Sequence, residues 1–189
     1  KEGETASPTI QPDYLEIGRR LGEQLKTKEQ KIGIIADWKM SEAVQAEISG
    51  LTEALEGSGS EISWCIYRRK EQNITERMKE ETKADALVIL DPGVLEEFGE
   101  QAEHGKYKGA ELYGVGYSLK TVALLDKGNI QGLVVPDGYE IGYKSVKEIA
   151  GKIEHKFYKM QGYTTEYQIF SKKDFFMDDD LERFLYSYE

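Results

Sequence analysis

Histidine, cysteine and proline are scarce in this sequence. Its 189 residues include two histidines, one cysteine and four prolines. One cysteine cannot form a disulfide within the chain, and His104 and His155 stand in polar stretches without partners at the spacing of zinc ligands. We therefore expect both histidines at the surface, and the sequence predicts neither a metal site nor a cofactor.

Clusters of basic residues are missing as well. Acidic residues outnumber basic residues by 35 to 25, which gives a net charge of -10 and an isoelectric point near 4.9. This balance argues against binding to nucleic acid or to an anionic membrane surface, because lysine and arginine clusters drive both. No apolar run reaches the roughly 18 residues that a membrane-spanning helix needs.

The common catalytic and phosphate-binding motifs are also missing. No serine lies in a Gly-x-Ser-x-Gly motif, and the glycines at 114–116 do not continue into a dinucleotide fingerprint, because Leu119 occupies the place of the third glycine. The acidic run 178–180 lacks the glycine and the distal glutamate of an EF-hand, and we assign it to the positive end of a helix. The sequence therefore predicts a protein that is not an enzyme.

Strand-like apolar runs and helical patterns alternate along the chain. Helical patterns occupy residues 14–28, 41–56, 73–83, 94–104, 119–126, 139–160 and 178–188, and strand-like runs occupy 31–37, 61–67, 85–91, 111–117, 130–135 and 165–170. This alternation predicts an α/β fold, a three-layer α/β/α sandwich with a mainly parallel sheet of about five or six strands. Cys65 lies inside the second run and is expected to be a buried, unreactive side chain.

Polar and aromatic residues follow the expected strands at their carboxyl ends, where open parallel sheets bind ligands. A few polar groups among aromatic rings are typical of a small-molecule cleft, especially one for sugars. The alternative for the rings of Trp38 and Tyr117 is ordinary packing at the rim of the sheet. The candidate ligand-binding residues are Asp37, Trp38, Arg68, Asp91, Tyr117 and Asp137.

Asp91 also allows a different interpretation. The run KADALVILDPG resembles the strand of a receiver domain that ends in the phosphorylated aspartate, and Asp37 could help to hold the Mg²⁺ that such chemistry needs. Receivers place two adjacent acids after the first strand and a lysine after the fifth. This chain has one acid, Asp37, and Pro136 at those places, so the receiver is the less favoured alternative.

Four segments occur in the order and spacing of a known family. They are residues 10–25 (IQPDYLEIGRRLGEQL), 31–55 with KIGII and ISGLTEAL, 114–146 (GVGYSLKTVALLDKGNIQGLVVPDGYEIGYKSV) and 167–188 (YQIFSKKDFFMDDDLERFLYSY). Together they resemble the type I periplasmic-binding-protein superfamily, which comprises sugar-type solute-binding proteins and the effector domains of lactose-repressor-like regulators. The resemblance covers almost the whole chain.

Members of this family have two lobes with the ligand between them, and the resemblance implies the C-terminal lobe without the N-terminal one. It divides the chain into a polar tether (1–12), a ligand-binding lobe (13–136), a hinge with the following helix (137–163) and a return strand with a terminal helix (164–189). The hinge is expected around Pro136-Asp137-Gly138.

The resemblance also assigns the helix after the hinge to the absent lobe. We expect its apolar side chains to be uncovered unless the helix folds back on its own sheet or joins a second chain. These side chains are Ile141, Val146, Ile149, Ile153 and Phe157.

One further candidate ligand-binding residue comes from the resemblance alone. The family's ligand-contacting arginine falls on Glu47, and its strand-end asparagine falls on Asp91, which can accept hydrogen bonds. A carboxylate in place of a guanidinium replaces five donors with an acceptor. The replacement implies a ligand other than an ordinary monosaccharide, a cationic ligand, or none.

These expectations describe an extracellular, membrane-tethered lipoprotein that binds a sugar or another small polar solute for a transporter or a sensor. Its partners would be that membrane component and either the missing N-terminal lobe or a second copy of the chain. The alternatives are a cytoplasmic effector domain of a lactose-repressor-like regulator and the receiver domain phosphorylated at Asp91.

Overall fold

The computed structural model describes residues 8–37, 41–68 and 73–172. The strands are β1 (Ile10–Pro12), β2 (Lys31–Ala36), β3 (Glu61–Tyr67), β4 (Ala86–Ile89), β5 (Glu111–Val115), β6 (Gly132–Pro136), β7 (Tyr163–Thr165) and β8 (Tyr167–Ser171). The helices are α1 (Tyr14–Leu25), α2 (Glu42–Leu55), α3 (Ile74–Met78), α4 (Pro92–Glu103), α5 (Leu119–Asp126) and α6 (Gly138–Glu154). The expected acidic run and terminal helix at 178–188 lie outside the described residues.

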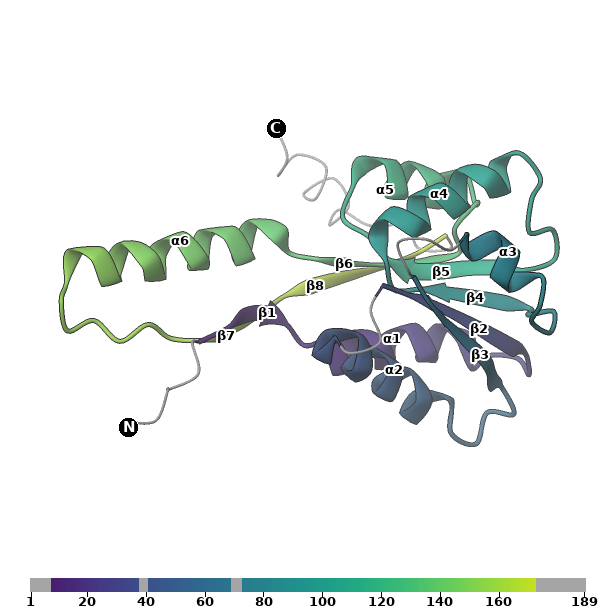
Figure 1. Cartoon of the computed structure of the whole chain (residues 1–189), viewed down its shortest axis with the longest axis horizontal. Coiled ribbons are helices and arrows are strands. Elements are labelled where there is room, and N and C mark those ends of the chain that lie inside the picture. Colours follow the sequence, from purple (N-terminus) through teal and green to yellow (C-terminus); the bar gives the residue numbers. More distant parts are fainter. Residues whose placement is uncertain (1–7, 38–40, 69–72, 173–189) are drawn as a thin grey trace.

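Six strands form one sheet in the order β3-β2-β4-β5-β6-β8 (Figure 1). The first five are parallel, and β8 returns antiparallel to β6. In the register, Ile34 of β2 lies opposite Cys65 on one side and Val88 on the other. The predicted mainly parallel sheet is confirmed.

Helices cover both faces of this sheet, and each face has its own apolar core. On one side α1 and α2 pack against residues such as Ile32, Ile34 and Val88. On the other side α4 and α5 pack against residues such as Ile89 and Leu133. The three-layer sandwich expected from the sequence is therefore present, because the parallel strands are apolar on both faces.

Each helix begins at a polar residue whose side chain accepts a hydrogen bond from the first turn. Because these caps satisfy free backbone N–H groups, they fix where each helix leaves the preceding loop or strand. The capping residues are Asp13, Ser41, Asn73, Asp91, Ser118 and Asp137.

The backbones of α1 and α2 touch where two glycines face them. A Cβ on Gly18 would lie 1.9 Å from the carbonyl oxygen of Glu47, and a Cβ on Gly50 would lie 1.9 Å from that of Leu15. Only glycine permits so close a crossing. The crossing holds the backbone of Glu47 directly against α1.

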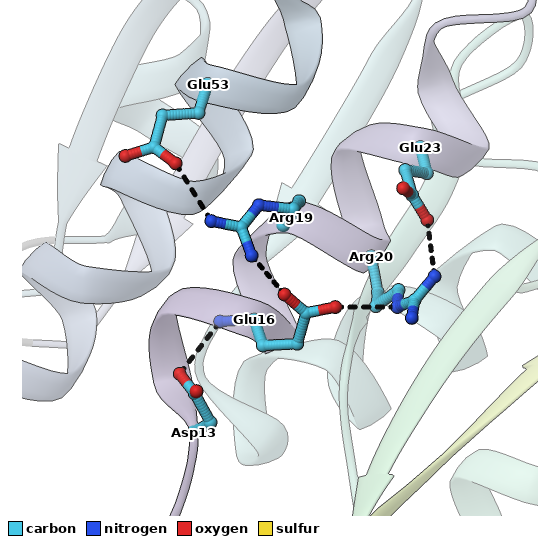
Figure 2. A network of polar contacts seen from close by, with 6 residues as sticks. All are labelled: Asp13, Glu16, Arg19, Arg20, Glu23 and Glu53. Carbon is cyan, nitrogen blue, oxygen red and sulfur yellow. Dashed lines mark hydrogen bonds and ion pairs between the residues drawn. The ribbon is translucent and has the colours of Figure 1, made fainter.

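An ion-pair network also connects the two helices, as Figure 2 shows. Arg19 of α1 pairs with Glu16 on its own helix and reaches Glu53 of α2 at 3.1 Å. Arg20 pairs with Glu16 and Glu23, each at 2.9 Å. These side chains are partly exposed, so we assign the network a minor share of the stability. The geometry of the helix pair is set by the glycine crossing.

A second unit projects from the sandwich (Figure 1). We call it the arm. It consists of α6 and the two-stranded parallel sheet of β1 and β7, in which Gln11 lies opposite Thr164. Residues 10–12, which the sequence placed in a polar tether, are thus a strand. The pairing partner lies about 150 residues away in sequence, and three-residue strands show no periodicity of their own.

A buried carboxylate closes the arm. Glu148 of α6 accepts hydrogen bonds from the backbone N–H of Gln161 at 2.8 Å and from the hydroxyls of Tyr163 and Tyr158 at 2.9 and 3.0 Å. The Gln161 N–H and the two hydroxyls hold the pKa of Glu148 below its usual range. These bonds fasten the end of α6 to β7.

The structure corrects two further expectations. The helix predicted to run to Met160 ends at Glu154, because the chain turns back and places the Tyr158 ring against Gly151. Cys65 is only partly buried, since β3 is the edge strand of the sheet. His104 and His155 are exposed, as predicted. Within the described residues, every helix is too short or too polar to cross a bilayer.

The glycine crossing makes a testable prediction. Gly50→Ala should lower the free energy of unfolding by about 2 kcal/mol or more, because backbone atoms of α1 cannot move away from the new methyl group. Gly142→Ala is the matched control. It lies within α6, and apart from its chain neighbours and the helix's own nearby backbone no atom lies within 4 Å of the new methyl group. We expect it to stabilise the chain by about 0.5 kcal/mol. Urea denaturation of both variants measures the difference, and equal effects would contradict the close crossing.

Candidate ligand-binding site

A pocket of about 780 Å³ opens at the carboxyl ends of the parallel strands. The strand order reverses between β2 and β4, because β3 lies on one side of β2 and the later strands on the other. Loops leave such a switch point in opposite directions and open a crevice, which is the usual ligand position in open α/β sheets. The pocket is lined by residues that follow β2, β3, β4 and β5, and by residues of α1, α2 and α6.

A guanidinium shared by two carboxylates forms the polar centre of the pocket. Arg68 follows β3, and its Nε and Nη2 donate to Asp37 Oδ1 at 3.2 Å. The same Nε lies 2.9 Å from Asp91 Oδ2. The side chains of Arg68 and Asp37 are about half exposed, whereas Asp91 is 5% exposed. The sequence placed all three at strand ends, and the structure brings them together.

Asp91 is anchored from two sides. Its Oδ1 accepts from the backbone N–H groups of Gly93 and Val94 at 3.0 and 3.1 Å, as the cap of α4. Its Oδ2 faces Arg68. A phosphorylated aspartate of a receiver domain needs a Mg²⁺ site beside it, and no group of three His, Cys, Asp or Glu side chains suited to a metal occurs among the described residues. The position of Asp91 favours a fixed hydrogen-bonding group.

Glu47 of α2 lies in the wall of the pocket and is 4% exposed. No hydrogen bond or ion pair joins its carboxyl to any other described residue. Burial raises the pKa of this carboxyl to about 8. Glu47 shares the buried face of α2 with Val44 and Leu51, so a carboxyl at an apolar helical spacing was the signal in the sequence. The family resemblance identified the same position by another route.

Two tyrosines complete the described wall. Tyr117 follows β5 and is 57% exposed at the rim, where its ring face is available. Tyr14, at the start of α1, also lines the pocket, although the sequence reasoning missed it. Burial, and secondly the negative charge of Glu47, raise the pKa of the Tyr14 hydroxyl.

The remaining candidates differ in position. Asp137 does not line the pocket. Its carboxylate caps α6 by accepting from the backbone N–H of Glu140 at 2.8 Å, between the pocket residues Pro136 and Gly138. Trp38 lies outside the described residues. Five of the seven predicted residues therefore line one pocket, namely Asp37, Glu47, Arg68, Asp91 and Tyr117.

Three chain connections lie side by side, and two of them contribute Pro12 and Pro136 to the pocket lining. They run from β1 to α1, from β6 to α6 and from β7 to β8, and they join the arm to the sandwich. Pro136 lies opposite Tyr167, and Asp137 N–H donates to the carbonyl of Glu166 at 3.0 Å. The sequence indicated only the middle connection, through its Pro-Asp-Gly turn.

No protein-family model matches the sequence, and a search of curated proteins finds no relative. Solved structures do match. GanP, a glucose-galactose binding protein from Geobacillus stearothermophilus, is 20% identical with a TM-score of 0.74, over 90% of this chain and 64% of that one. The Caulobacter myo-inositol binding protein bound to myo-inositol is 14% identical with a TM-score of 0.77, over 97% and 66%.

A third match comes from the complex of the TorS sensor domain with TorT in the absence of ligand. It is 16% identical with a TM-score of 0.70, over 92% of this chain and 61% of that one. This chain thus spans less than two thirds of the length of each of these structures. The fold is that of one lobe of a type I periplasmic binding protein, as the sequence resemblance predicted.

The burial of Glu47 predicts an unusual pH dependence. An unfolded chain releases the Glu47 proton near pH 4.5 and the folded chain near pH 8, so the folded state binds more protons between these values. The free energy of unfolding should therefore fall as pH rises through this window, by an amount of the order of 3 kcal/mol. Glu47→Gln should remove this fall, because glutamine has no proton to lose.

Urea denaturation between about pH 5 and pH 8 measures the effect. Glu56→Gln, at the exposed C-terminal end of the same helix, is the control for loss of one carboxyl and should keep the slope. Parallel curves for Glu47→Gln and the parent chain would contradict the raised pKa.

Proposed function

We propose that this protein is the ligand-binding lobe of an extracellular solute-binding protein, which captures a small polar solute bearing several hydroxyl groups and presents it to a membrane transporter or sensor. The observation that carries the proposal is the arrangement of Arg68 between Asp37 and Asp91 at the carboxyl ends of β3, β2 and β4. A lipoprotein anchor on the outer side of the membrane is part of the proposal.

The chemistry of these residues suits a polyol. A sugar hydroxyl both donates and accepts, so it can donate to a carboxylate and accept from the guanidinium at once. Charged groups of this kind give the stronger hydrogen bonds, and Asp91 is already held in place by the cap of α4. Tyr117 offers a ring face at the rim for the C–H face of a sugar.

Gly138 and Ile141 of the arm line part of the pocket, and the arm supports the proposal of a second lobe. The apolar stripe of α6 does not fold back on the sheet (Figure 1). Its side chains are exposed except for Ile141, which is partly buried. Ile153 is 79% exposed and Phe157, just beyond the helix, is 90% exposed. Contiguous exposed apolar residues of this kind are typical of an interface.

We assign this stripe to the missing N-terminal lobe of the same protein. In that arrangement the three connections would form the hinge, and the pocket would be the cleft between two lobes. Each lobe would supply part of the ligand contacts, and the ligand would favour the closed state because only that state makes both sets. The shorter span of this chain relative to its structural matches supports this assignment.

The matches also support the class of ligand and partner. By their names, one of these proteins binds glucose and galactose and another binds myo-inositol. The third match comes from a complex that contains a sensor domain. Whether this protein serves a transporter or a sensor is decided by which membrane component it contacts.

Calorimetric titration with pentoses, hexoses and inositols tests the polyol site on the protein with its N-terminal lobe. Arg68→Ala should weaken binding at least about tenfold, because it leaves two carboxylates without their shared donor. Arg20→Ala, which removes two partly exposed ion pairs on α1, should leave affinity unchanged. An unchanged affinity of Arg68→Ala, or no binding of any of these polyols to the parent protein, contradicts the proposal.

The docking of α6 has a separate test. Ile153→Asp should change the stability of the chain of 189 residues by less than about 0.5 kcal/mol, since the side chain is exposed there. In the protein with its N-terminal lobe the same variant should lose about 2 kcal/mol or more, because a carboxylate would then be buried. Equal, small effects in both forms would refute the interface. Sedimentation of a dimer through α6 would assign the stripe to a second copy instead.

A further inference from the structure

We propose that the ligand of this site carries a protonated amine as well as hydroxyl groups, as an amino sugar or an amino-substituted polyol does, and that the carboxylate of Glu47 binds the amine. The inference rests on the proposed function, since it names the class of solute for the same pocket. It depends on the position of Glu47, its lack of a partner, and the charge of the other groups that line the pocket.

The position of Glu47 is fixed independently of any ligand. Its carbonyl lies where a side chain on Gly18 would stand, and a side chain on Gly50, one turn later in α2, would meet the carbonyl of Leu15. A rotation of α2 that carried the Glu47 carboxyl toward solvent would therefore break the crossing with α1. Val44 and Leu51, which flank Glu47 on the same face, are buried.

The lack of a partner makes this carboxyl costly in the free protein. An isolated buried carboxylate is strongly disfavoured, so the group stays protonated until a cation or a set of donors reaches it. The buried carboxylates of Glu148 and Asp91 show the ordinary solution in this chain. Glu148 accepts from three donors. Asp91 accepts from two backbone N–H groups and forms an ion pair with Arg68. The carboxyl of Glu47 has neither a hydrogen-bond donor nor a cationic partner among the described residues.

The charge of the pocket favours a cation. Arg68 is the one basic side chain among the described residues that line it, and two carboxylates already share it. The other titratable groups of this lining are the hydroxyls of Tyr14 and Tyr117, from α1 and from the end of β5. Even with Glu47 protonated, the described part of the lining is net negative, with Asp37 and Asp91 against Arg68. An ammonium group brings the missing positive charge, whereas a neutral sugar does not.

Paired probes test the inference on the protein with its N-terminal lobe. D-glucosamine is compared with D-glucose, and D-galactosamine with D-galactose, at about pH 6.5, where an aliphatic amine is protonated. Each amine should bind at least about tenfold more tightly than its neutral pair. Glu47→Gln should remove this preference, so that each amine and its neutral pair bind with similar affinity. Glu56→Gln should change neither.

A second readout distinguishes an ion pair from a packing effect. Binding of an ammonium to a protonated Glu47 requires the carboxyl to ionise, so about one proton per ligand should pass to the buffer. Calorimetric enthalpies in two buffers with different ionisation enthalpies count that proton. The neutral sugars, and every ligand of the Glu47→Gln variant, should release none.

The outcomes separate the two levels of the argument. Amine and neutral sugars that bind equally, or an amine preference that survives Glu47→Gln, overturn the amine inference and leave the polyol site intact. Absence of binding by all four sugars overturns both. The inference is supported if the parent protein prefers the amine and releases a proton on binding it, and the Glu47→Gln variant does neither.

Discussion

The close crossing of α1 and α2 is the constraint on which the candidate site depends. Gly18 and Gly50 let the two backbones touch, and the contact turns the face of α2 that contains Glu47 into the protein. The same crossing places Tyr14, at the start of α1, in the wall of the pocket. With a wider separation Glu47 would reach solvent, and its carboxyl would be an ordinary surface charge.

The sheet supplies the other half of the site. Parallel strands bring their carboxyl ends to one edge, so Asp37, Arg68 and Asp91 meet although they lie far apart in sequence. Asp91 serves two purposes, since one oxygen caps α4 and the other faces the guanidinium. The cap of α4 fixes the position of Asp91, and its second oxygen faces the pocket residue Arg68.

Local sequence rules predicted most of the sandwich. The apolar runs located most strands of the large sheet within a few residues, and α5 was predicted at its observed bounds. In the structure Ser118 caps its start, and Gly128, with a φ of 78°, lies just beyond its end. The strand-end residues followed from the same pattern. Asp137 shows the limit of this reasoning, because an aspartate between a strand and a helix can be a cap, a ligand-binding group or both.

The pairing of strands far apart in the chain could not be predicted from the sequence. β1 has three residues and pairs with β7, so no periodicity could reveal it, and the early end of α6 depends on Tyr158 packing against Gly151. The burial of Glu47 could be predicted from the sequence only in part. Its spacing from Val44 and Leu51 placed it on the apolar face of α2, but the depth of burial depends on the crossing with α1.

The receiver domain, the less favoured alternative, has the same order of parallel strands as this protein. The order of the first five strands in the sheet is also that of flavodoxin-like proteins, to which receivers belong. The differences lie in β8, in the arm and in the engagement of Asp91 by Arg68. These features suit a lobe that binds a solute beside a hinge.

The most direct test of this account is the ionisation of Glu47 itself. Carbon NMR of the protein with labelled glutamate side chains follows each carboxyl through a pH titration, and Glu47→Gln assigns the resonance. The account predicts that one carboxyl titrates near pH 8 in the free protein and far lower when an amino sugar is bound. A Glu47 carboxyl that titrates near pH 4.5 without ligand would contradict a buried, unpaired group and with it the proposed role of this site.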